Sequence, residues 1–135
     1  MAILNAQAVS KALLQVSAEA EAMGVSIAMA VVDTAGRKAA FFRMPGSFLA
    51  SDDFARWKAW TAVSFSMKTS DFASMLRSLP TDVARGLLDH PEVTDLPGGC
   101  PIVSHRQIIG AVGISGGSGE QDDMLSDTAA IVLAE

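Results

Sequence analysis

A glycine-rich stretch followed by acids contains the residue types that most directly suggest chemistry. Residues 108–123 read IIGAVGISGGSGEQDD, an apolar run that continues through glycines to Glu120, Asp122 and Asp123. The GISGG segment inside it fits the G-x-S-x-G pattern, in which Ser115 would be the nucleophile of a hydrolase. Glycines that precede a helix can also bind a phosphate through their backbone N–H groups. The stretch therefore raises two catalytic or binding hypotheses at once.

The order of the residues argues against both hypotheses. In hydrolases with this pattern the acid and the histidine follow the serine in the chain. Here His90 and His105 both precede Ser115. A phosphate is disfavoured because the acids after the glycines would repel an anion, and because the G-x-x-x-x-G-K-[ST] pattern does not occur. We predict neither a serine hydrolase nor a nucleotide-binding loop.

The remaining interpretation of the stretch is steric. Gly116 and Gly117 remove side chains where a ligand, another backbone segment or a neighbouring subunit could come close. Glu120 and Asp122 would then be polar contacts at the mouth of a ligand site. A simpler interpretation stays open, in which the acids only complement the positive end of a helix dipole.

Positive charge to oppose these acids is expected from two residues. Arg43 ends the segment FFRM, and Lys58 lies between Trp57 and Trp60. An arginine binds a carboxylate with two parallel hydrogen bonds, whereas a lysine acts as a point charge. We therefore expect Arg43 and Lys58 to bind an anionic group of a small ligand, and an ordinary surface role for each is the alternative.

Local patterns place these residues on elements in the order α-β-β-α-α-loop-β-β-α. Apolar residues at three- and four-residue steps predict a first helix from Ala6 to Met23 that Gly24 ends. Alternating and apolar runs separated by turn residues predict two hairpins, formed by residues 25–34 with 37–44 and by residues 102–105 with 107–115. Hairpins pair antiparallel, and helices are expected before, between and after them, so we predict an α+β fold in which helices flank antiparallel strands.

The other helices are predicted from their caps and their apolar faces. Ser51 is expected to cap the second helix, and Ser70 and Asp71 to start a shorter one that Pro80 ends. Residues 96–101, LPGGCP, are expected to form a rigid loop. Phe54, Trp57, Thr61 and Phe65 are expected to share a face of the second helix. Met124, Leu125, Thr128, Ala129 and Val132 are expected on one side of the last helix.

Composition restricts the possible partners. The 135 residues predict one domain, 1–135, and the net charge of −5 disfavours nucleic acids and anionic membranes. A single cysteine and the absence of a signal-peptide pattern favour the cytoplasm, and no apolar run is long enough to span a membrane. Half the residues are hydrophobic, with a mean hydropathy of +0.32, so we expect a homo-oligomer that buries part of this surface.

Four segments in register resemble the GlcG/HbpS-like haem-degrading-domain family, which includes the C-terminal domain of PduO-type proteins. The segments are AMAVVDTAGRKAAFFRMPGS, RWKAWTAVSFSMKTSDF with its K-A-x-T-A core, LPGGCPI and IIGAVGISGGSGEQD. The resemblance covers essentially the whole chain. It implies a profilin-like fold with a central antiparallel sheet flanked by helices, a homo-oligomer, and in some members the binding of haem or corrinoid-related tetrapyrroles.

Haem binding would need an axial donor to the iron, an apolar slot and positive charge for two propionates. The candidate donors are His90, His105, Cys100 and the seven methionines. The predicted first helix has no histidine, and no C-x-x-C-H pattern for covalent attachment occurs. The histidines and cysteine have no tight ligand spacing, so no metal site is predicted.

The sequence supports three hypotheses about function. The first is a small-molecule-binding protein whose ligand is haem or a related tetrapyrrole; its predicted ligand-binding residues are Arg43, Lys58, Gly98, Gly99, Gly116, Gly117, Glu120 and Asp122. The second is a catabolic enzyme of the isomerase, hydrolase or lyase type that acts on a small carboxylate, with Glu120, Asp122, His105 or Cys100 as acid or base. The third is an assembly subunit without catalytic activity.

Overall fold

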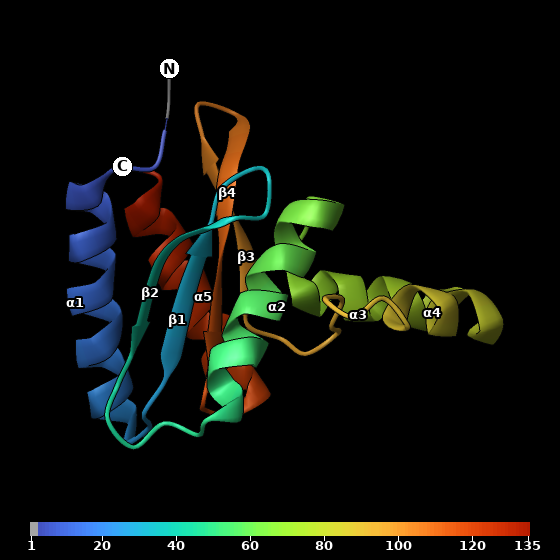
Figure 1. Cartoon of the computed structure of the whole chain (residues 1–135), viewed down its shortest axis with the longest axis horizontal. Helices are drawn as coiled ribbons and strands as arrows, with labels where there is room; N and C mark the ends of the chain where they lie inside the picture. The colour runs from blue at the N-terminus through green and yellow to red at the C-terminus, as the bar shows by residue number, and fades with distance from the viewer. Residues whose placement is uncertain (1–2) are drawn as a thin grey trace.

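Five helices and four strands follow one another along residues 3–135, the part of the chain that the computed structural model describes (Figure 1). In chain order they are α1 (Ala6–Met23), β1 (Ala28–Val32), β2 (Lys38–Arg43), α2 (Ala50–Phe65), α3 (Thr69–Ser78), α4 (Thr81–Leu88), β3 (Gly99–Ser104), β4 (Gln107–Ser115) and α5 (Gly119–Leu133). Within this range no helix is both long and apolar enough to cross a membrane.

The four strands form one antiparallel sheet in the order β2-β1-β4-β3. Each outer pair is a hairpin, and the central pairing of β1 with β4 joins the two hairpins, from Ala28 opposite Ser115 to Val32 opposite Ala111. The predicted α+β fold with a central antiparallel sheet of two hairpins flanked by helices is therefore confirmed.

Helices α1 and α5 pack against each other and cover one face of the sheet (Figure 1). On α1 the buried residues recur at steps of four, at Ala8, Ala12, Val16 and Ala20, as the apolar pattern predicts. Gly24 ends the helix in the left-handed conformation, with φ of 75°, which glycine adopts without steric cost. Of the residues expected on one side of α5, Leu125, Ala129 and Val132 are buried, Thr128 is half-buried and Met124 is 51% exposed.

Helix α2 covers the opposite face and lies unusually close to it. A methyl group at Gly113 would overlap the carbonyl oxygen of Ala55, and one at Gly99 would overlap the carbonyl oxygen of Lys58. The strands thus touch the helix backbone itself. Only small or extended side chains fit such a narrow gap, and the buried residues of α2 are Ser51, Ala55, Lys58, Ala59, Thr61 and Ala62.

Of the four residues expected to share a face of α2, Thr61 is buried, whereas Phe54, Trp57 and Phe65 are half-buried. The start of α2 also differs from the prediction. Leu49 already has helical dihedral angles, so Ser51 lies inside the first turn, is only 3% exposed and makes no cap.

Two differences concern the segment between α2 and β4. Pro80 ends α3 as predicted, but it also precedes α4, an eight-residue helix that the sequence patterns did not predict. Strand β3 begins at Gly99, inside the expected LPGGCP loop. Pro101 is compatible with a strand because β3 lies at the edge of the sheet, where a missing N–H leaves no ladder hydrogen bond unmade.

Candidate functional site

Two of the predicted ligand-binding residues form a buried ion pair. The Lys58 ammonium lies 3.0 Å from the Asp122 carboxylate, and each side chain is only 4% exposed. Lys58 also donates to the carbonyl oxygen of Ile114 at 2.9 Å, and Asp122 accepts a hydrogen bond from the backbone N–H of Gly117 at 2.9 Å. This pair links α2, β4 and α5. Burial lowers the pKa of Lys58, and the negative charge of Asp122 opposes that shift.

The glycines predicted to line a ligand site lie against the chain itself. A side chain at Gly98 would meet the carbonyl oxygen of Ile114 and the Asp122 side chain, and one at Gly116 would meet the carbonyl oxygen of Ser26. A side chain at Gly117 would meet Gln121 and Asp122. Close backbone approach therefore accounts for Gly98 and Gly116, and neighbouring side chains crowd Gly117. Direct contact of these glycines with a ligand stays a prediction.

The other predicted charged residues lie apart from this pair. Glu120 is exposed in the first turn of α5, whose N-terminus is capped by a reciprocal pair of hydrogen bonds between Ser118 and Gln121. Arg43 is exposed at the end of edge strand β2. Its partner on β1 is Ala28, which on its other side pairs with Ser115 of β4. The structure thus brings together Lys58 and Asp122, and it leaves Arg43 and Glu120 on the surface.

An open groove of about 540 Å³ lies between β3 and α5. Its lining is mostly apolar: Cys100, Pro101, Val103, Asp127, Ala130, Ile131 and Ala134. Val103 and Ile131 are 53% and 70% exposed, so much of the apolar wall faces outward. The groove contains Cys100 and lies apart from the glycine-rich stretch.

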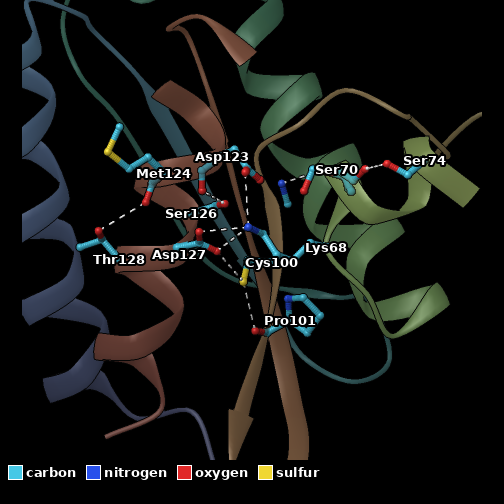
Figure 2. A network of polar contacts seen from close by, with 12 residues as sticks. Lys68, Ser70, Ser74, Cys100, Pro101, Asp123, Met124, Ser126, Asp127 and Thr128 are labelled. Atoms are coloured by element: carbon cyan, nitrogen blue, oxygen red, sulfur yellow. Dashed lines mark hydrogen bonds and ion pairs between the residues drawn. The ribbon is translucent and has the colours of Figure 1, made fainter. Parts of the chain in front are cut away.

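A polar network borders the groove (Figure 2). Lys68, in the link between α2 and α3, bridges two acids on α5: its ammonium lies 2.8 Å from Asp127 and 3.3 Å from Asp123. The thiol of Cys100 points toward Asp127, with a distance of 3.7 Å between sulfur and oxygen. Burial disfavours the Lys68 ammonium, but its hydrogen bond to Asp127 and the charges of both acids outweigh burial and raise the pKa of Lys68.

Cys100 is protected from ionisation in this setting. Burial raises the pKa of the Cys100 thiol to about 12, and the negative charge of Asp127 acts in the same direction. A thiolate is the reactive form of cysteine, so the environment of Cys100 is opposite to that of a catalytic nucleophile. It is equally unsuited to giving up a proton near neutral pH.

The two histidines lie away from the groove lining. His105 is exposed at the tip of the β3–β4 hairpin, where it and Arg106 both have positive φ angles, of 50° and 66°. His90 is stacked on Trp60, with ring centroids 4.8 Å apart, and its Nδ1 accepts a hydrogen bond from the N–H of Glu92. Over residues 3–135 no three His, Cys, Asp or Glu side chains are placed to bind a metal ion. Met1, one of the methionines considered, lies outside the described residues.

Sequence reasoning missed Lys68 and Asp127. One signal was available for the acids, because Asp123 and Asp127 are four residues apart and must share a face of α5. No local signal places Lys68 beside them, because 59 residues separate Lys68 from Asp127. The groove needed the packing of α5 against β3 before it could be recognised.

Comparison with known proteins gives this site a context. The family described as haem degrading protein HbpS-like matches residues 4–130. Protein GlcG of Escherichia coli K12 is 34% identical over 133 residues, which cover 98% of this chain and 96% of GlcG. The corrinoid adenosyltransferase PduO of Citrobacter freundii is 35% identical over 112 residues; these are 82% of this chain but only 33% of PduO, so the match spans about a third of that relative.

Solved structures agree with the sequence matches. A structure of PduOC in complex with haem superposes with a TM-score of 0.87 at 27% identity, over 96% of this chain and 94% of that one. A structure of HbpS superposes with a TM-score of 0.87 at 32% identity, over 100% of this chain and 93% of that one. The order of elements, the sheet and the four sequence segments thus agree with both comparisons, and the chain belongs to the HbpS-like haem-degrading family.

Proposed function

We propose that this protein binds a small apolar molecule and that its ligand is haem or a related tetrapyrrole. The observation that carries the proposal is the likeness, over 96% of the chain, to a structure solved as a haem complex. The groove between β3 and α5 supports it. Its volume of about 540 Å³ lies in the range of roughly 300–1,000 Å³ typical of small-molecule pockets.

The walls of the groove suit a flat macrocycle. Val103 and Ile131 present most of the exposed apolar surface in the groove, at 53% and 70% exposure, and a bound ring would remove this surface from water. Burial of apolar area contributes about 25 cal/mol per Å². A tetrapyrrole bound in this way would gain most of its affinity from burial of the apolar faces of its ring.

The donors in the groove do not suit an iron-thiolate bond. Cys100 is the one sulfur among the lining residues, and burial together with Asp127 holds its thiol protonated. No histidine lines the groove. We therefore propose that affinity comes from the macrocycle, with no contribution from Cys100 as an axial ligand.

A titration with two porphyrins tests the proposal. Hemin and metal-free protoporphyrin should both give saturable changes in absorption at a defined stoichiometry, with affinities within about tenfold of each other. Ile131→Asp should weaken both, because it puts a charge on the apolar wall, whereas Leu14→Asp on α1 is the control. Non-saturating titrations with both porphyrins would overturn the proposal. If the protein strongly prefers hemin and Cys100→Ser removes that preference, Cys100 is an axial ligand of the iron after all.

The hypothesis of an enzyme for small carboxylates has less support. It requires a cation, Arg43 or Lys58, to hold the substrate beside an acid or base. Lys58 is buried in its pair with Asp122, and Arg43 is exposed at the end of β2, apart from that pair. Asp122 and Cys100, two of the four predicted acid or base residues, are buried, and Glu120 and His105 are exposed on separate surfaces. Four cavities along residues 3–135 are each lined by at most one of these four residues.

A further inference from the structure

Asp127 is the one charged residue among the described residues that line the groove between β3 and α5. Its carboxylate lies 3.7 Å from the thiol of Cys100, so these two residues mark the same end of the groove. From this contact β3 leads to Val103 and α5 leads to Ala134, because both elements run back along β4 (Figure 1). The groove therefore extends from an end at Asp127 to an opposite end at Val103 and Ala134.

The end of the groove at Asp127 has an excess of negative charge. Lys68 is shared by two acids, because its ammonium lies 2.8 Å from Asp127 and 3.3 Å from Asp123 (Figure 2). One ammonium cannot neutralise two carboxylates, and Oδ1 of Asp123 is buried without a hydrogen-bond partner among residues 3–135. The pKa of the Cys100 thiol reports the same excess: after burial, Asp127 raises it more than Lys68 lowers it.

The opposite end of the groove is surrounded by different charges. Glu135 follows Ala134, but it pairs one to one with Lys11, at 2.7 Å between the ammonium and the carboxylate. Arg106 is exposed at the tip of the β3–β4 hairpin, which continues directly from Val103. A ligand with one charged edge and one apolar edge therefore meets a different electrostatic potential at each end of the groove.

We infer that Asp127 makes the groove selective for tetrapyrroles whose carboxylates lie along one edge only. The inference rests on the proposed function, since it concerns how a ring lies in that groove. The uncharged edge of such a ring lies beside Asp127, and its carboxylate edge lies toward Val103 and Ala134. A ring with a carboxylate on every pyrrole has no uncharged edge, so one carboxylate must approach Asp127. Repulsion between like charges is stronger in a partly desolvated groove than in water, and it disfavours the second kind of ring.

Titrations with protoporphyrin and coproporphyrin test this selectivity. The two molecules share the macrocycle, but protoporphyrin has two propionates on one edge, whereas coproporphyrin has four, one on each pyrrole. The wild-type protein should bind coproporphyrin about tenfold more weakly, as expected of one like-charge contact that water partly screens. The difference should narrow when salt is raised from about 0.02 M to about 0.5 M, because the Debye length becomes shorter.

Three variants separate the charge of Asp127 from its shape. Asp127→Asn leaves Lys68 paired one to one with Asp123, so it should bring the affinity for coproporphyrin to within about threefold of that for protoporphyrin. Lys68→Gln should act in the opposite direction and widen the difference, because both acids lose their cation. Asp53→Asn is the matched control: it removes the same charge from an exposed position on α2, on the opposite face of the sheet, and should leave the difference unchanged. Circular dichroism checks that each variant is folded.

The outcomes distinguish this inference from the proposed function. Saturable binding of protoporphyrin with an equal affinity for coproporphyrin overturns the selectivity and leaves the proposed function in place. Weaker binding of coproporphyrin that persists in Asp127→Asn also overturns the selectivity, because the size of the ring substituents then explains the difference. A protoporphyrin titration that does not saturate overturns both.

Discussion

At the residue scale, Lys58 and Asp122 show how a charged pair can be part of the core. Both lie in segments that the sequence patterns assigned to a ligand site, yet each is 4% exposed and each is hydrogen-bonded to backbone as well as to the other. Removing one partner from a buried pair leaves an uncompensated charge, which costs about 3–5 kcal/mol. The two partners differ in how they can avoid this cost.

We predict that Lys58→Met lowers the free energy of unfolding by about 3–5 kcal/mol, because the Asp122 carboxylate stays buried without its cation. Lys11→Met is the matched control, since the Lys11–Glu135 pair is 60% and 53% exposed and should contribute at most about 1 kcal/mol. Urea unfolding followed by circular dichroism measures both. Equal effects of the two substitutions would contradict the structural role of Lys58.

Asp122→Asn should be milder than Lys58→Met and should depend on pH. Burial lowers the pKa of Lys58 below its ordinary value of 10.5, and without the Asp122 charge only the hydrogen bond to the Ile114 carbonyl oxygen opposes this shift. Between the folded pKa and 10.5 the unfolded chain binds more protons, so stability rises with pH in this window. The free energy of unfolding of Asp122→Asn should therefore rise more steeply toward pH 10 than that of the wild type. A parallel pH dependence would refute this account.

Cys100 gives a second prediction at the same scale. Its pKa of about 12, compared with an ordinary value of 9.0, reduces the thiolate fraction near pH 8 about 1,000-fold. The reaction of the native protein with a small maleimide should be at least that much slower than the reaction of the protein in guanidinium chloride, where Cys100 is exposed. Native reactivity within tenfold of the unfolded rate would show that the thiol is not protected.

At the element scale, the close approach of α2 to the sheet depends on glycines in the strands. Gly113 faces the carbonyl oxygen of Ala55 and the backbone nitrogen of Ala59, and Gly99 faces Lys58. The N–H of Gly99 also donates to the Thr69 hydroxyl at 2.9 Å, which ties the outer edge of β3 to the start of α3. The narrow gap explains why small residues of α2 face the sheet and large aromatic residues lie at its sides.

We predict that Gly113→Ala lowers the free energy of unfolding by about 3 kcal/mol or more, because a backbone atom of α2 cannot move out of the way without displacing the helix. Gly86→Ala on α4 is the matched control. Open space surrounds Gly86, and alanine in a helix should stabilise the protein by about 0.5–1 kcal/mol. Chemical unfolding curves should show a lower free energy of unfolding for Gly113→Ala and a higher one for Gly86→Ala. An unchanged free energy of unfolding for Gly113→Ala would rule out the tight contact.

At the scale of the whole molecule, helix α4 and the open groove both leave apolar surface exposed. The homo-oligomer that the composition predicts would bury part of this surface. The melting temperature of an assembly depends on protein concentration, because unfolding also separates the copies. Each tenfold rise in concentration adds about 1.4 kcal/mol per dimer, or about 0.7 kcal/mol per chain, which should raise the Tm by about 2–3 °C.

Differential scanning calorimetry over a hundredfold range of concentration should show this dependence for the wild type. A Tm that does not change with concentration in the wild type would mean that the assembly contributes nothing to stability.

Local patterns in the sequence determined most of the elements and the family. Patterns among residues that are close together in the sequence predict the first helix and both hairpins. They also predict the turn at His105 and Arg106. The four family segments lie in register along the chain, and the comparisons agree with them. Helix α4 was missed because Pro80 ends one helix and begins another, and a proline that stops a helix carries no information about the next element.

Tertiary structure alone decided which residues meet. Lys58 and Asp122 are 64 residues apart in the chain, and Lys68 and Asp127 are 59 apart, so no local rule relates either pair. The buried face of α2 depended on the glycines of β3 and β4 opposite it, and the groove depended on the way α5 packs against β3. Helix and turn preferences are properties of neighbouring residues, whereas burial, ion pairing and pKa depend on the surfaces that folding places in contact.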